Sequence, residues 1–138
     1  MSGKKAFLDT NLFIYLIEEN ELYLEKVHNL LQFLDKNGYE VITSTLTLGE
    51  ILTKPYKDER LDLVERYKEF FSDMELVELN REIGSLFAEI RATYNIKTPD
   101  AVQLASAIYA KAELFVSNDD RLSRFESDRC QVLLLSEF

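Results

Sequence analysis

Short apolar runs alternate with longer segments of helical periodicity along the whole chain. The runs have the length of buried β-strands and fall at residues 5–9, 39–43, 76–79, 114–117 and 131–135. The segments between them repeat apolar residues every three or four positions, as amphipathic helices do. Helices that connect successive strands are typical of a parallel sheet covered on both faces. The alternation therefore predicts an α/β fold around a parallel sheet of about five strands.

Turn and cap residues divide the helical segments. Asn37-Gly38 predicts the end of one helix, and Pro55 is expected to lie just beyond the end of another. Ser44 or Thr45 is a suitable N-cap for the helix that precedes Pro55. Helices are expected at residues 12–17, 21–35, 45–54, 58–71, 81–94 and 98–111, with a last turn at 121–125.

Length and composition indicate one soluble domain, residues 1–138. Hydrophobic residues make up 46% of the chain, which is enough for a buried core. The single cysteine, Cys130, cannot close an intramolecular disulfide and is expected to be buried. Asp9-Thr10-Asn11 interrupts the first apolar stretch, and no run approaches the roughly 20 apolar residues of a membrane helix. We expect a cytoplasmic protein that does not enter the membrane.

Four acidic residues mark the points where strands end or the following helices begin. They are Asp9, Glu50, Asp100 and Asp119. Because the carboxyl ends of parallel strands face one crevice, these side chains are expected to converge there. Hard oxygen ligands suit Mg²⁺ or Mn²⁺, and the chain has only one cysteine and one histidine for a zinc site. A divalent-metal site is therefore the leading hypothesis.

Each acid also has an ordinary structural alternative. Asp9 could cap the next helix, and Glu50 could be a solvated surface residue or form a capping box with Thr47. Thr98 as N-cap and Pro99 at the first helical position would place Asp100 in the first turn of its helix, whose dipole favours an ionised carboxylate. Asp119 and Asp120 both follow a strand, and their order leaves open which caps the next turn.

The net charge of −9 disfavours a broad basic surface for nucleic acid. A carboxylate cluster would account for part of this excess, and bound divalent cations would reverse the local field. The acidity could instead suit a basic protein partner. Cations near the site-bearing segments are candidates for substrate binding, although each could equally be scattered surface charge: Lys54, Lys57, Arg60, Lys97, Arg121 and Arg124.

Four motifs in this order resemble the PIN-domain family of metal-dependent ribonucleases, which includes VapC-type toxins of toxin–antitoxin modules. The matching segments are Phe7-Leu8-Asp9-Thr10-Asn11, Thr47-Leu48-Gly49-Glu50-Ile51-Leu52, Thr98-Pro99-Asp100-Ala101 and Val116-Ser117-Asn118-Asp119. The resemblance spans nearly the whole chain, and its Glu50 segment is the loosest match.

The resemblance implies a three-layer α/β/α sandwich, Mg²⁺ or Mn²⁺, cleavage of RNA, an antitoxin partner and a homodimer. It further implies that Asp9, Glu50, Asp100 and Asp119 hold the metal and serve catalysis. Asn11 and Ser117 would support them by orienting carboxylates or water.

Three other classes can be compared with the same residues. Phosphohydrolases of the haloacid-dehalogenase type resemble Asp-x-Asp-x-Thr, whereas this chain has Asp9-Thr10-Asn11-Leu12 and lacks the second aspartate. A non-catalytic interaction module would suit the negative charge, but it would not need an intact set of acids. A dinucleotide-binding fold is disfavoured because no G-x-G-x-x-G follows the first strand.

Overall fold

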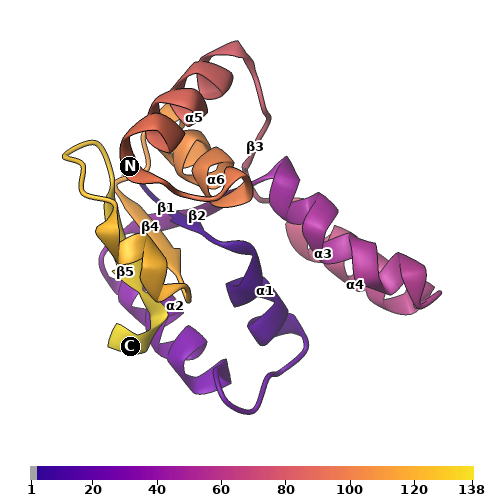
Figure 1. Ribbon diagram of the computed structural model, residues 1–138. Helices are drawn as coiled ribbons and strands as arrows, with labels where there is room; N and C mark the ends of the chain where they lie inside the picture. The colour runs from indigo at the N-terminus through magenta and orange to yellow at the C-terminus, as the bar shows by residue number, and fades with distance from the viewer. Residues whose placement is uncertain (1–2) are drawn as a thin grey trace.

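The computed structural model describes residues 3–138, in which strands and helices alternate (Figure 1). The strands are β1 (Lys4–Leu8), β2 (Tyr39–Ser44), β3 (Leu76–Val77), β4 (Leu114–Ser117) and β5 (Gln131–Leu134). The helices are α1 (Thr10–Ile17), α2 (Leu24–Lys36), α3 (Thr45–Lys57), α4 (Leu61–Phe71), α5 (Arg81–Tyr94) and α6 (Thr98–Tyr109). Two 3₁₀ turns complete these elements, η1 (Asp120–Arg124) and η2 (Leu135–Glu137).

The five strands form one parallel sheet in the order β3-β2-β1-β4-β5. The chain builds one half of the sheet outward from β1 and then returns to the other side of β1 with β4. Leu8 at the end of β1 is paired with Val116 in β4. The strand order therefore reverses between β1 and β4, and the loops that follow these two strands lie side by side. The predicted α/β fold with a parallel sheet of five strands is confirmed.

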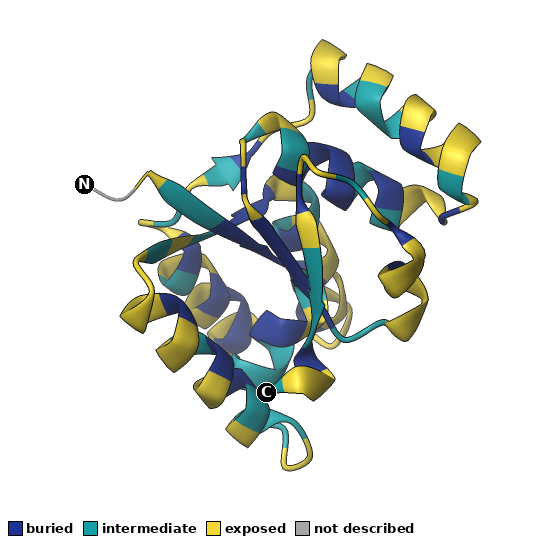
Figure 2. Cartoon of the chain, turned by 90° about the vertical axis from the view of Figure 1, so that its left-hand side faces the viewer, coloured by how far each residue is buried: buried dark blue, intermediate teal, exposed yellow. Residues whose placement is uncertain are grey.

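Alternating residues of the strands build two apolar layers. Ala6 and Leu8 face the core that α1, α2, α3 and α4 cover. Phe7 points to the opposite face, where its ring stacks on Phe115 at 5.4 Å and where α5 and α6 pack. This alternation follows from the two-residue period of a strand. Figure 2 shows the buried sheet enclosed by helices that turn their exposed faces outward, which is the expected three-layer sandwich.

Several element boundaries differ from those expected. The helix expected to end before Pro55 continues to Lys57, because the proline is buried in the last turn, where only one backbone hydrogen bond is lost. The helix expected from residue 21 begins at Leu24, since the side chain of Asn20 holds a turn by accepting from the amides of Leu22 and Tyr23. The strand expected at 76–79 contains two residues only.

Helices α3 and α4 form a hairpin that projects from the rest of the molecule (Figure 1). The fully buried Tyr67 of α4 donates its hydroxyl to Glu18 at the end of α1, which ties the hairpin to the body. Cys130 is buried as expected, and burial raises the pKa of its thiol to about 12. Within residues 3–138, no helix has the length and apolar character needed to cross a membrane.

Candidate metal centre

The four predicted acids line one crevice at the carboxyl ends of the strands. It has a volume of about 290 Å³ and lies where the strand order reverses, the usual place for a ligand in an open α/β sheet. Its lining residues are Asp9, Thr10, Asn11, Ile14, Glu50, Pro99, Asp100, Gln103 and Asp119. The polar groups among them are carboxylates, amides and a hydroxyl. This set of oxygen donors, without histidine or cysteine, fits Mg²⁺ or Mn²⁺.

Asp9 lies at the floor of this crevice, between β1 and α1. One carboxylate oxygen caps α1 by accepting from the amide of Thr10 at 2.8 Å, and the other accepts from the Ser117 hydroxyl at 2.9 Å. Burial raises the pKa of Asp9 to about 6, and these two hydrogen bonds offset part of that effect. The negative charges of Asp100 and Glu50 raise this pKa further. Asp9 is therefore both a helix cap and a partly buried carboxylate that a cation would stabilise.

Ser117 joins the two central strands of the site. Its side chain is buried at the end of β4, where it donates to Asp9 and accepts from the amide of Asp119 at 3.0 Å. The hydroxyl thus fixes the orientation of one carboxylate and the backbone position of another. Asn11, the second predicted supporting residue, lies in the first turn of α1 and lines the crevice.

Glu50 reaches the crevice from the second turn of α3. Its carboxylate accepts a hydrogen bond from Thr10 at 2.6 Å, which links α3 to the start of α1. The N-cap of α3 is Ser44, whose hydroxyl accepts from the amide of Thr47, so Glu50 takes no part in a capping box here.

Asp100 occupies the first turn of α6, as expected, but the cap differs from the expected one. Lys97 is the N-cap residue, so Thr98 and Pro99 are the first two helical residues. Burial raises the pKa of Asp100, and the negative charge of Asp119 raises it further. The ionised carboxylates of Asp9 and Asp100 are thus both destabilised by burial and by neighbouring negative charge, and a bound divalent cation would offset this effect.

Asp119 is engaged by an arginine two residues away. Its carboxylate accepts from Nε of Arg121 at 3.0 Å and from a terminal guanidinium nitrogen at 2.8 Å, and it also caps η1 through the Arg121 amide. These hydrogen bonds lower the pKa of Asp119. Asp120 is exposed and begins η1, so the crevice is lined by the first of the two neighbouring aspartates.

The carboxylates share the crevice without forming a closed cage. Nowhere in residues 3–138 do three or more Asp, Glu, His or Cys side chains come close enough together to hold a metal ion. Two of the carboxylates are engaged by other groups: Asp119 accepts from Arg121, and Glu50 accepts from Thr10. Ligation by the full set would require rearrangement of these side chains.

A buried polar network behind the crevice was not expected from the sequence. Gln103 of α6 accepts from the Ser44 hydroxyl and donates to the Thr47 hydroxyl at 2.7 Å, and its side chain is almost fully buried. Thr43 in turn donates to Thr47 at 2.8 Å. The network fixes α6 and α3 relative to each other, and therefore Asp100 relative to Glu50. The sequence feature that could have indicated this network is the polar Gln103 among the small apolar residues of its helix.

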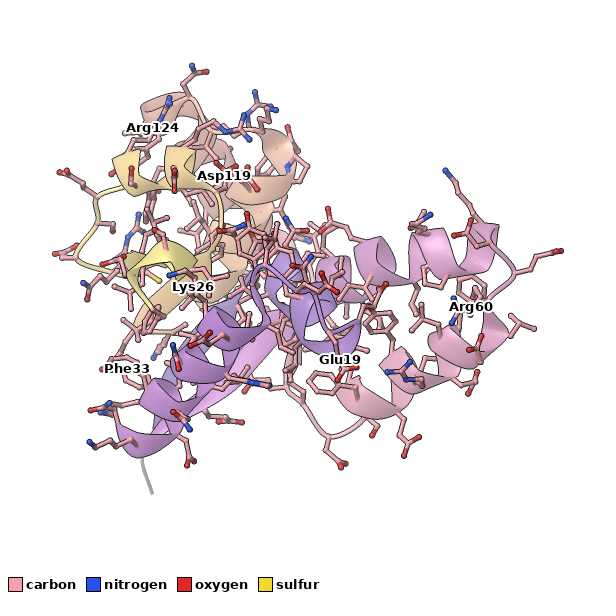
Figure 3. The ribbon with its side chains drawn as sticks, turned by 90° about the horizontal axis from the view of Figure 1, so that it is seen from below. Glu19, Lys26, Phe33, Arg60, Asp119 and Arg124 are labelled. Atoms are coloured by element: carbon pink, nitrogen blue, oxygen red, sulfur yellow. The ribbon has the colours of Figure 1, made fainter. Side chains whose placement is uncertain are left out.

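The predicted substrate-binding cations fall into two groups. Lys54, Lys57 and Arg60 lie on the α3–α4 hairpin and do not line the crevice. Lys54 and Arg60 instead pair with Asp58 and Asp62. Figure 3 shows Arg60 far out on the hairpin, well separated from Asp119. Another set of cations lies beside the crevice and lines an adjoining cavity: Lys97, Arg121 and Arg124.

Residues 6–127 match the model of the PIN domain family, and the chain belongs to this family. A search of curated proteins finds no match.

Solved structures of low sequence identity share the fold. VapBC2 from Rickettsia felis, bound to a DNA fragment from its promoter, aligns with a TM-score of 0.75 at 20% identity over 94% of this chain and 98% of that chain. A toxin–antitoxin complex from Klebsiella pneumoniae aligns with a TM-score of 0.67 at 20% identity, over 88% of this chain and 99% of that chain. FitAcB from Neisseria gonorrhoeae aligns with a TM-score of 0.68 at 18% identity, over 96% of this chain and 99% of that chain.

Proposed function

We propose that this chain is a metal-dependent endoribonuclease that hydrolyses RNA phosphodiester bonds, with residues 1–138 acting as one domain. The observation that carries the proposal is the convergence of Asp9, Glu50, Asp100 and Asp119 on one crevice of a PIN-domain chain. These four residues come from four different elements and are separated by 19 to 50 positions in sequence. Helix capping alone gives no reason for four acids to gather at the point where the strand order reverses.

The four carboxylates would hold Mg²⁺ or Mn²⁺. When bound, such an ion supplies Lewis-acid activation of water and of the scissile phosphate. Ser117 keeps the Asp9 carboxylate in a fixed orientation, and Thr10 does the same for Glu50. Asn11 offers an amide at the wall of the crevice that can hydrogen-bond RNA or water. None of the acids is required as a nucleophile in this mechanism.

We also propose a biological role as the toxin of a toxin–antitoxin pair, in the cytoplasm, with an antitoxin protein as partner and a homodimer as the assembled form. The similar structures named as VapBC and toxin–antitoxin complexes support this role because they share the fold over nearly the whole chain. The test is expression of the chain alone and together with any small open reading frame that adjoins its gene. Growth arrest that the neighbouring product relieves is expected, and normal growth in both cases would contradict the role.

The enzymatic proposal is tested by cleavage of a single-stranded RNA in Mg²⁺ or Mn²⁺. Asp9→Asn and Asp100→Asn should each reduce the cleavage rate by about 10² or more, because removing one ligand costs several kcal/mol of transition-state stabilisation. Asp128→Asn is the matched control, since Asp128 is exposed and forms no ion pair among the described residues.

Calorimetric titration with Mn²⁺ on the same variants separates a nuclease from a non-catalytic interaction module. The wild type and the control are expected to bind the ion, and the Asp9 and Asp100 variants are expected to bind it more weakly. Cleavage at the wild-type rate by both site variants would contradict the proposed mechanism.

A further inference from the structure

A second cavity of about 200 Å³ adjoins the acidic crevice, and Asp100 lines both. Three cations line this second cavity, Lys97, Arg121 and Arg124, and together they are called the basic pocket. Figure 3 shows Arg124 and Asp119 on the same side of the molecule, away from the hairpin. A chain of net charge −9 with 16 basic residues thus places three of them around one cavity beside its carboxylate cluster.

Buried neighbours anchor the backbone that carries these cations. Lys97 follows Ile96, which is 5% exposed. Arg121 and Arg124 lie on either side of Leu122, which is 2% exposed and belongs to the same core as Ile96. The positions of the three charges are therefore set by core packing, and little ordering of the backbone is needed when a ligand binds.

Two of the three cations form no direct ion pair in the described part of the chain, although the charge of Lys97 acts to lower the pKa of both Asp100 and Asp119. Lys97 and Arg124 take part in none of the ion pairs found in residues 3–138, and the only side-chain hydrogen bond of Arg124 there goes to the Arg121 carbonyl at 3.1 Å. By contrast, Lys54 and Arg60 on the hairpin are both paired. The basic pocket thus keeps positive charge available for an anion from outside the chain.

Arg121 shows the geometry that such an anion would use. Its guanidinium grips Asp119 with two parallel hydrogen bonds of 3.0 and 2.8 Å. A phosphate presents oxygen pairs to the same planar fork. The Arg121 side chain of this pair is 61% exposed and that of Asp119 is 26% exposed, so an anion from solvent can reach the guanidinium and compete with Asp119 for it.

We propose that the basic pocket binds the RNA phosphate next to the one that is cleaved, and that Arg121 leaves Asp119 for this phosphate when a divalent cation takes over Asp119. The inference rests on the proposed ribonuclease function, since it assigns a subsite for the same substrate. It explains how an acidic protein holds RNA beside a carboxylate cluster. The exchange also couples the two ligands: the cation frees Arg121 for the phosphate, and the phosphate frees Asp119 for the cation.

The first test measures RNA binding without cleavage. A fluorescently labelled single-stranded oligoribonucleotide is titrated in EDTA at several NaCl concentrations, and its affinity is read from anisotropy. Lys97→Ala and Arg124→Ala should each weaken binding about five- to tenfold and lower the slope of log affinity against log salt by about 0.7, the value for one phosphate contact with a single strand.

Two exposed residues near the amino ends of the strands, away from the crevice at their carboxyl ends, provide matched controls. Lys36 ends α2, and Arg129 precedes β5 and pairs with Glu89 at 3.0 Å, much as Arg121 pairs with Asp119. Lys36→Ala and Arg129→Ala should leave RNA affinity and its salt dependence unchanged.

The second test measures cation binding without RNA. Arg121→Ala removes the internal cation from Asp119, so calorimetry should show Mn²⁺ binding at least about twofold tighter than in the wild type, although the same variant binds RNA more weakly in Mn²⁺. An affinity for Mn²⁺ equal to that of the wild type would overturn the exchange of Arg121.

The outcomes separate this inference from the proposed function. If the Lys97 and Arg124 variants match the two controls in RNA affinity and salt slope, the subsite is overturned whether or not the protein cleaves RNA. If the wild type binds RNA through these residues but never cleaves it, the subsite stands and the nuclease proposal fails. A wild type that neither binds the oligoribonucleotide in EDTA nor cleaves it in Mn²⁺ overturns both.

Discussion

Replacing Asp9 by asparagine should stabilise the cation-free protein while weakening its response to divalent cations. The carboxyl is partly buried near two other acids, and its pKa is raised from 3.8 to about 6. Such a rise corresponds to a cost of about 3 kcal/mol for keeping the group ionised in the folded state. Asparagine removes this cost and keeps an oxygen that can accept from the Thr10 amide. The free energy of unfolding should therefore increase by up to about 3 kcal/mol at pH 7.5.

The sign of the pH dependence follows from the direction of the shift. A raised pKa means that the folded state favours the protonated carboxyl, so the penalty is complete above pH 6 and disappears as the pH falls toward 3.8. The advantage of Asp9→Asn over the wild type should accordingly shrink to about half between pH 7.5 and pH 5. Divalent cations should reverse the order, because a ligand present at about 1,000 times its Kd adds about 4.1 kcal/mol to the protein that binds it.

Urea unfolding in EDTA at pH 7.5 and pH 5, repeated in Mn²⁺, measures these effects. Asp128→Asn is the control, because it removes the same charge from an exposed position. Thermal unfolding should show an increase of roughly 10 °C for Asp9→Asn in EDTA at the higher pH. A variant that is no more stable than the wild type at pH 7.5, or whose advantage does not change with pH, would refute the conclusion that ionised Asp9 destabilises the folded state.

Two further substitutions test how the site is held. Gln103→Leu should lower the free energy of unfolding by about 2–4 kcal/mol, because it leaves the buried Ser44 hydroxyl without its acceptor and removes one of the donors to Thr47. Urea unfolding measures this loss, and the exposed Gln32→Leu should have no such effect. Tyr67→Phe should cost about 1–2 kcal/mol by removing the hydroxyl that binds Glu18. RNA cleavage should be unchanged in Tyr67→Phe, and a large loss of activity would show that the hairpin anchor affects the site.

Periodicity and junction residues were sufficient to predict the elements of this fold. Phe7 and Phe115 belong to buried strands that the apolar runs mark directly, and parallel pairing follows from the helices between them. Convergence of Asp9, Glu50, Asp100 and Asp119 could also be expected, because it depends only on all strands pointing the same way. Their catalytic role stays a prediction.

Features that depend on side-chain partners from distant segments could not be predicted in this way. The local rule for proline predicted that α3 would end before Pro55, but burial of the ring in the last turn outweighs the loss of one hydrogen bond. The Gln103 side chain bonds to none of the polar residues of its own helix in the described structure, and its partners Ser44 and Thr47 lie more than fifty positions earlier. Such pairs are fixed by tertiary packing, which a single sequence does not encode locally.

The net charge of −9 was an argument against nucleic-acid binding. The distribution of charge over the molecule weakens that argument. Average charge determines the field far from a protein, where salt screens it within about 10 Å. A phosphate inside a cavity responds to the groups that line it, here Lys97, Arg121 and Arg124 beside the carboxylates. Acids that lie more than a Debye length from the pocket are screened by salt and oppose those contacts weakly. An acidic protein can therefore bind RNA through a small basic pocket, and the affinity should be modest and strongly salt-dependent.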